Sequence, residues 1–218
     1  MGDQRVFIVG DIHGCLGTLE RLMDKVPWEP ERDQLIFLGD YIDRGRDSKG
    51  VVDYLVALKN SSPNVRFIMG NHELMLLDYL EGRNRDLYMA NAGYTTLRSY
   101  LEARPPGEEF LVPPDHMSFY HSLETYIDLK DYYVVHAGFR PGIDLAEQAL
   151  EDMVWIREPF IYSDYDFGKK VIFGHTPFKR PLITENKLGL DTGAVYGNRL
   201  TCLELPEVMF HSVEAKGF

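Results

Sequence analysis

Long apolar runs are missing from this chain, and cysteines are few. No segment approaches the roughly 18 consecutive apolar residues that a membrane-spanning helix needs, so we expect no membrane partner. The two cysteines, Cys15 and Cys202, form no Cys-x-x-Cys pair, which argues against a zinc ribbon or a dithiol redox site. A disulfide between them stays open. The strand-like run "RVFIVG" follows the N-terminus almost directly, so we expect no signal peptide and a cytoplasmic location.

Basic residues are also scarce relative to acidic ones. The chain has 23 lysines and arginines against 34 aspartates and glutamates, a formal net charge of −11. Nucleic acid is therefore not an expected partner, because its binding depends on basic contacts to phosphates. A phosphorylated substrate remains compatible, because divalent cations would supply positive charge where that substrate binds.

The first third of the chain alternates strand-like and helix-like segments. Apolar runs over residues 5–10, 34–39 and 65–70 are each followed by apolar residues at helical spacing. This alternation predicts a largely parallel sheet. From residue 171 onward, short strands follow one another at tight spacing, which favours antiparallel pairing.

Residues 83–125 break this pattern. We expect one helix through residues 87–101, then a proline-rich loop over residues 103–117. The segment reads as a helical and loop insertion within one domain that covers residues 1–218, and no linker divides the chain.

Ligand-type side chains follow the ends of five predicted strands. In α/β sheets, ligands bind beyond the carboxyl ends of strands, so these side chains should converge in space. Aspartate, histidine and asparagine suit Mn, Fe or Zn. A helix cap or a structural histidine would explain a polar residue at one strand end. Such roles would hardly explain five strand ends that each carry a ligand-type residue beside a glycine. The set comprises Asp11, His13, Asp40, Asp43, Asn71, His72, His136 and His175.

Five segments, in this order, resemble the motifs of the phosphoprotein phosphatases, within the calcineurin-like metallophosphoesterase superfamily. They are "GDIHG", "GDYIDRG", "GNHE", "HAG" and "GHTP". Two more segments, "WIRE" (155–158) and "DTGAV" (191–195), resemble bacterial members. In size the chain is similar to the small bacterial and phage-type serine/threonine phosphatases.

The resemblance implies an α/β (α+β) fold in which two mixed β-sheets pack face to face and helices flank them. It also implies two divalent metal ions, with Mn²⁺ expected first and Fe or Zn as alternatives. The implied metal ligands are Asp11, His13, Asp40, Asn71, His136 and His175. The implied catalytic residues are His72 as proton donor, Asp43 as its orienting partner, and Arg44 and Arg157, which with Asn71 bind the phosphate.

These roles predict a dinuclear-metal-dependent phosphomonoester hydrolase in which a metal-bridging hydroxide attacks directly. The resemblance favours a serine/threonine or dual-specificity protein phosphatase that acts on a phosphorylated protein or peptide. One departure is Met69, where protein phosphatases usually carry an arginine. The role of Glu73 in "GNHE" has two alternatives, a structural pair with an arginine or a cap of the following helix.

Two other functions stay open. A nucleotide phosphoesterase, such as a diadenosine tetraphosphate hydrolase, would also carry an apolar residue at position 69, whereas Asp43 and Thr176 favour the protein phosphatases. A non-catalytic metal-binding scaffold is the third alternative, but mere binding needs no proton donor.

Overall fold

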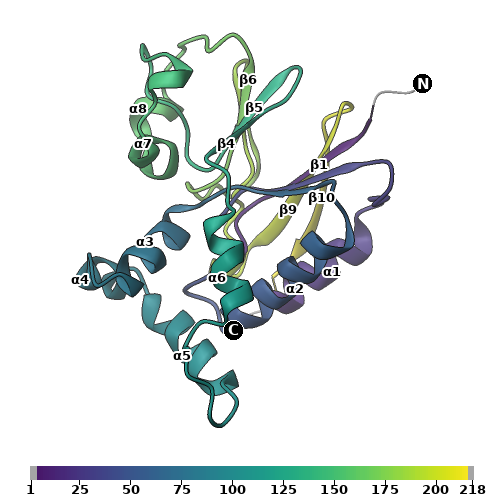
Figure 1. Ribbon diagram of the computed structural model, residues 1–218. Helices are drawn as coiled ribbons and strands as arrows, with labels where there is room; N and C mark the ends of the chain where they lie inside the picture. The colour runs from purple at the N-terminus through teal and green to yellow at the C-terminus, as the bar shows by residue number, and fades with distance from the viewer. Residues whose placement is uncertain (1–3, 216–218) are drawn as a thin grey trace.

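The computed structural model describes residues 4–215 and contains two five-stranded mixed sheets (Figure 1). The first sheet has the order β10-β9-β1-β2-β3. Strands β1, β2 and β3 run parallel, as expected, whereas β9 pairs antiparallel with both β1 and β10. Its strands are β1 (Val6–Val9), β2 (Gln34–Phe37), β3 (Val65–Phe67), β9 (Arg199–Leu205) and β10 (Met209–Glu214).

The second sheet has the order β4-β5-β6-β8-β7. Its central pairs β5–β6 and β6–β8 are parallel, and its outer pairs are antiparallel. The antiparallel prediction for the strands after residue 171 is therefore wrong for β6 and β8. Between β6 and β8 the chain forms β7, which lies at the sheet edge and runs antiparallel to β8. Strand β8 can therefore lie between β7 and β6 and run parallel to β6. The strands are β4 (Tyr126–Asp128), β5 (Tyr132–Val135), β6 (Lys170–Phe173), β7 (Leu182–Ile183) and β8 (Lys187–Gly189).

The two sheets pack face to face, because alternate strand residues point to opposite faces. In β1, Ile8 enters a buried cluster shared with the second sheet, whose members include Ile172 and Leu188. Its neighbours Phe7 and Val9 enter a different cluster, which packs against the helices. The predicted fold class is thereby confirmed.

Helices cover the outer faces of both sheets (Figure 1). The helices that pack against the first sheet are α1 (Leu16–Lys25), α2 (Ser48–Ser61), α3 (Asn71–Leu80), α5 (Gly93–Ala103) and α6 (Pro114–His121). Against the second pack α7 (Leu150–Trp155) and α8 (Glu158–Ile161). The 3₁₀ turns are η1 (Leu145–Glu147) and η2 (Ala194–Tyr196). No helix within residues 4–215 has the length and hydropathy needed to cross a membrane.

The segment after α3 differs in detail from the expectation. The single helix predicted over residues 87–101 is two helices, α4 (Arg85–Ala90) and α5 (Gly93–Ala103). Ala92 takes a left-handed conformation between them, with φ of 67°, which ends one helix before the next begins. The proline-rich loop is also shorter than predicted, since Pro113 and Pro114 open a further helix, α6 (Pro114–His121). Proline fits there because the first helical N–H groups need no partner within the helix.

Candidate metal centre

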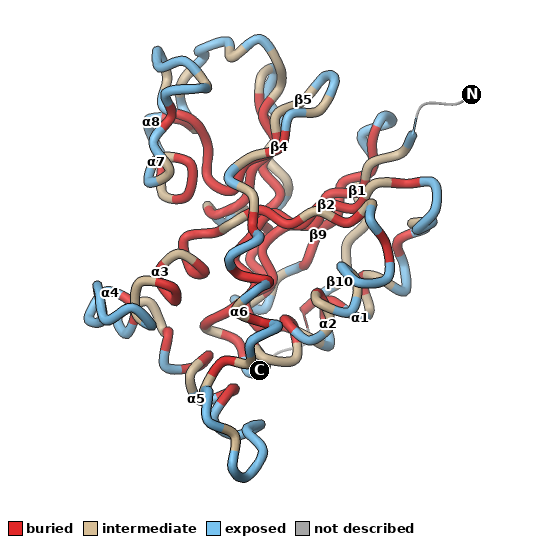
Figure 2. The backbone as a smooth tube through the Cα atoms, viewed as in Figure 1, coloured by how far each residue is buried: buried red, intermediate tan, exposed pale blue. Residues whose placement is uncertain are grey.

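The predicted metal ligands lie beyond the ends of strands from both sheets, whereas Arg157 lies between α7 and α8. The chain stays buried as it leaves these strands, over residues 10–15 and 38–43 in the first sheet and 136–139 in the second (Figure 2). Connecting loops usually run over the surface. Buried polar loops therefore mark this edge as the place where function is expected.

Two overlapping groups of side chains could each hold a metal ion. One group contains His13, Asp40 and His72, and the other contains Asp40, His136 and His175, with candidate ligand atoms within 4.8 Å of one another in each. Asp40 belongs to both groups. The first group also includes His72, for which the sequence predicts a proton-donor role.

Two histidines are held so that one ring nitrogen faces the centre. His13 Nδ1 donates to the Ile42 carbonyl and His136 Nδ1 to the Leu38 carbonyl, both at 2.8 Å. A carbonyl only accepts, so Nδ1 of each ring carries a hydrogen, and Nε2 is the nitrogen that turns toward the centre. Such outer hydrogen bonds commonly orient metal-binding histidines.

Asp11, which follows the end of β1, is a further candidate ligand. Its Oδ2 accepts the His175 N–H at 2.9 Å, whereas its Oδ1 is buried with no hydrogen-bond partner in the part of the chain described. His175 Nδ1 has none there either. A side-chain carbon on Gly174 would lie 2.1 Å from Asp11 Oδ1, so only glycine leaves that atom accessible. Unpaired buried polar atoms are costly, and a bound cation would satisfy both.

The charges at the centre also favour cations. Burial and the neighbouring Asp191 raise the pKa of Asp11 well above its ordinary value, and burial raises that of Asp191 to about 6. Burial alone would lower the pKa of His136, but the Asp40 carboxylate raises it to about 9. These buried carboxylates repel one another, and divalent ions would relieve that repulsion.

The backbone is strained at the same residues. Eight non-glycine residues have positive φ within residues 4–215, and five of them are predicted site residues. Such conformations cost free energy and cluster at functional sites. The five are His13, Asp40, Asp43, Arg44 and His175.

Asn71 and His72 open helix α3 rather than ending a strand. Neighbouring residues of an extended backbone face apart, which would give Asn71 and His72 separate tasks, but the backbone here is helical, so that argument is wrong. Successive residues in a helix differ by about 100° in direction, which still separates their side chains. Asn71 Oδ1 lies 3.2 Å from His136 Nε2, while His72 Nδ1 lies 2.6 Å from Asp43 Oδ2.

Glu73 organises the start of the same helix. Its buried carboxylate accepts N–H groups from Gly70, Asp40 and Tyr41, at 3.0, 2.9 and 2.8 Å. Of the two predicted roles, capping is the one observed, and the carboxylate also holds the loop after β2. Burial and the nearby Asp40 raise the pKa of Glu73 to about 7.

The His72–Asp43 pair is supported by residues that the sequence did not single out. Asp43 Oδ1 accepts from Tyr88 at 3.0 Å and from Thr96 at 2.5 Å. The Asp43 N–H in turn donates to Thr96 Oγ1 at 2.9 Å and to Ser48 Oγ at 3.0 Å. Tyr88 belongs to α4 and Thr96 to α5, so the inserted helices supply hydrogen bonds that hold Asp43 in place. Neither residue lies in a recognisable motif.

Replacing Thr96 with valine should lower the free energy of unfolding by about 1–3 kcal/mol, because buried groups of Asp43 would lose a partner. Urea denaturation measures the change. Tyr94→Phe, which alters an exposed residue of the same helix, should leave stability within about 0.5 kcal/mol of the wild type. Equal stability of the two variants would contradict the supporting role of Thr96.

Both predicted phosphate-binding arginines reach the centre. Arg44 Nη1 donates to His13 Nε2 at 2.5 Å, and Arg157 Nε donates to His175 Nε2 at 3.1 Å. Their guanidinium groups therefore stand beside candidate ligands from different sheets. Planar guanidinium groups suit phosphate oxygens, which they bind through two hydrogen bonds.

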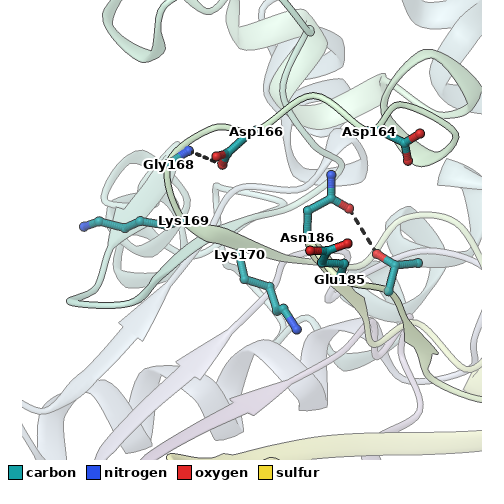
Figure 3. Close-up of a pocket in the computed structure, with 8 residues that line it drawn as sticks. Asp164, Asp166, Gly168, Lys169, Lys170, Glu185 and Asn186 are labelled. Carbon is teal, nitrogen blue, oxygen red and sulfur yellow. Dashed lines mark hydrogen bonds between the residues drawn. The ribbon is translucent and has the colours of Figure 1, made fainter.

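Other sequence expectations concern residues outside the centre. Cys15 and Cys202 are both buried and free, so the disulfide that stayed open does not form. A separate cavity of about 420 Å³ lies at the opposite, amino-terminal end of β6, beside Lys169, Lys170 and Asn186 (Figure 3). It includes none of the candidate ligands. Its Asp166 accepts the Gly168 N–H within a turn, and Lys169 pairs with Asp128 outside it.

Two packed sheets with oxygen and imidazole donors beyond their strand ends are the arrangement of a metal-dependent hydrolase. The chain belongs to the calcineurin-like phosphoesterase family, whose model matches residues 4–200.

Relatives of known name are similar over nearly the whole chain. A protein of Bacillus thuringiensis (strain Al Hakam), bis(5′-nucleosyl)-tetraphosphatase PrpE [asymmetrical], is 29% identical over 94% of this chain and 92% of its own length. A Geobacillus protein of the same name is 28% identical over 96% of this chain and 94% of its own.

Solved structures show the same fold. A candidate diadenosine tetraphosphatase covers 100% of this chain and 95% of its own, with 25% identity and a TM-score of 0.76. A cold-active protein-tyrosine phosphatase of Shewanella covers 99% of this chain and 81% of its own, with a TM-score of 0.74. Its identity is 18%, so it supports the fold alone.

Proposed function

We propose that this chain is a metal-dependent hydrolase of bis(5′-nucleosyl) tetraphosphates. The observation that carries the proposal is its similarity to proteins of that name over 94% of this chain and 92% of theirs. A protein phosphatase, which the motifs favoured, is thus less well supported than a hydrolase of bis(5′-nucleosyl) tetraphosphates. The match covers the strand-end loops and the helices between them, and is not confined to the shared motifs.

Met69 agrees with this substrate class. It occupies the position where protein phosphatases usually carry an arginine, and its half-buried side chain packs against the core cluster between the first sheet and the helices. The phosphate would then be bound by Arg44 and Arg157 without a third arginine at position 69.

The donor set fits divalent metal ions. The residues that would hold them are Asp11, His13, Asp40, Asn71, His136 and His175. With no thiolate present, Mn²⁺ is the ion we expect first, with Fe or Zn as alternatives. When bound, such ions activate water and neutralise phosphate charge.

The chain's own side chains would orient the substrate and deliver a proton. Arg44 and Arg157 would orient the polyphosphate, and His72, held by Asp43, would deliver a proton to the departing oxygen. Water adds to one phosphorus and one P–O–P bond breaks. Asymmetrical cleavage of diadenosine tetraphosphate by this route gives one AMP and one ATP.

A serine/threonine or dual-specificity protein phosphatase is the second candidate. The His72–Asp43 contact favours it, because an alkoxide leaving group needs a proton more than a departing phosphate does.

A substrate panel with Mn²⁺ separates the two functions. We expect kcat/KM for diadenosine tetraphosphate to exceed that for phosphoserine, phosphothreonine and phosphotyrosine peptides by roughly 100-fold or more, because a site suited to a nucleotide leaves polar groups unpaired with other substrates. Chromatography of the products should show AMP and ATP in equal amounts. Faster hydrolysis of any peptide would overturn the proposal in favour of the protein phosphatase.

A further inference from the structure

A hollow of about 440 Å³ adjoins the candidate metal centre. Its lining includes Pro177, two residues after His175, and Gly193, two residues after Asp191. The other residues that matter here are Phe178, Lys179, Tyr196 and Asn198. The hollow thus begins where the chain leaves two residues of the centre.

Tyr196 connects the hollow with the phosphate-binding side chains. The residue is 63% exposed, and its ring centroid lies 5.8 Å from Cζ of Arg44. The tyrosine ends a 3₁₀ turn between Gly193 and Gly197, whose φ values of 69° and 82° suit glycine. Exposed tyrosines are common, but within residues 4–215 Tyr196 is the one whose ring stands against Arg44, which also contacts His13.

The two walls of the hollow are tied together. The Asn198 side chain donates to the Lys179 carbonyl at 3.2 Å and to the Thr192 carbonyl at 2.7 Å. One wall therefore continues from His175 and the other from Asp191. A ligand between them would need little rearrangement of the backbone, which favours binding.

Positive charge extends outward from the hollow. A neighbouring hollow of about 500 Å³ shares Lys179 and Asn198 and adds Arg180 and Arg199. Arg199 pairs with Glu214 at 3.1 Å, whereas Lys179 and Arg180 pair with no acid within residues 4–215. On a chain with a net charge of −11, this basic group points to an anionic ligand.

We propose that the Tyr196 hollow binds a nucleoside of the dinucleoside polyphosphate, with the base stacked on the Tyr196 ring. The inference rests on the proposed function and specifies where its substrate binds. A base offers a flat π face to an exposed aromatic ring, and its phosphates would lead to Arg44 on one side and to Lys179 and Arg180 on the other.

Equilibrium binding tests the hollow without any turnover. Two probes share the same charged group, namely α,β-methylene-ADP, which carries a nucleoside, and methylenediphosphonate, which carries none. Calorimetry with Mn²⁺ should show the nucleotide binding roughly tenfold more tightly to the wild type, in line with the stacking of one base.

Variants assign that difference to the ring. Tyr196→Ala should remove most of the nucleotide's advantage and leave the Kd of methylenediphosphonate unchanged, whereas Tyr196→Phe should keep it. Tyr162→Ala, which removes an 81% exposed tyrosine in another loop, should behave as the wild type.

Three results would overturn the inference. Equal affinity of both probes for the wild type would show that no nucleoside subsite exists. Equal weakening of both by Tyr196→Ala would mean that the ring acts only through Arg44. A phosphoserine peptide that depends on Tyr196 while the nucleotide does not would make the hollow a peptide site. Absence of diadenosine tetraphosphate hydrolysis, with nucleotide binding intact, would instead overturn the proposed function and leave the subsite standing.

Discussion

Replacing His72 with asparagine should reduce kcat/KM for a phosphoserine peptide by roughly 10²–10⁴-fold, the range expected when a general acid is lost. The loss on p-nitrophenyl phosphate should be far smaller, because its leaving group departs without a proton. The structural basis is the 2.6 Å contact between His72 Nδ1 and Asp43, with Nε2 buried and unpaired in the described chain. Stopped assays on both substrates measure the two losses.

Metal content decides between the two roles that the geometry allows for His72. A proton donor can be replaced without loss of metal, whereas a ligand cannot. We expect the His72→Asn protein to retain the wild-type metal stoichiometry by mass spectrometry, and the exposed His121→Asn control to match the wild type throughout. Equal losses on both substrates, together with a missing ion, would assign His72 to the metal centre instead.

Replacing Asp40 with asparagine should lower the activity on any substrate by roughly 10³-fold or more and reduce the bound metal. Asp40 is the one residue that both groups of candidate ligands share within the described chain. Asparagine keeps the shape but removes the charge, so two sets of histidines would lose their common anionic partner. Kinetics and metal analysis of the purified variant measure both effects.

Metal removal should reproduce that loss reversibly. A chelator should abolish wild-type activity, and Mn²⁺ should restore it best among divalent ions. Asp86→Asn, which removes an exposed carboxylate from α4, should retain full activity and metal. Undiminished activity in a protein shown to be free of metal would refute the metal centre altogether.

The strand ends were predictable because local chemistry marks them. At Asp11 and Asp40 an apolar run stops, a glycine stands beside the acid, and parallel strands bring the two together. Similar reasoning predicted the parallel strands β1, β2 and β3 of the first sheet. It failed for β6 and β8, because spacing along the chain does not show which edge a returning strand joins.

The support of the site was not predictable in the same way. Tyr88 and Thr96 meet Asp43 only after α4 and α5 have folded onto α2 and α3, and each lies more than 40 positions from it in sequence. No periodicity connects such distant positions. The start of α3 at Asn71 also depends on a distant contact, since the Glu73 carboxylate that caps the helix accepts the N–H of Asp40 as well.

The division of the candidate ligands between two sheets has a consequence for how the site assembles. Asp11, Asp40 and Asn71 follow strands of the first sheet, while His136 and His175 follow strands of the second. During synthesis from the N-terminus, the first three emerge long before the others. A full coordination set can therefore exist only after the second sheet has docked, so metal loading would report completion of the fold.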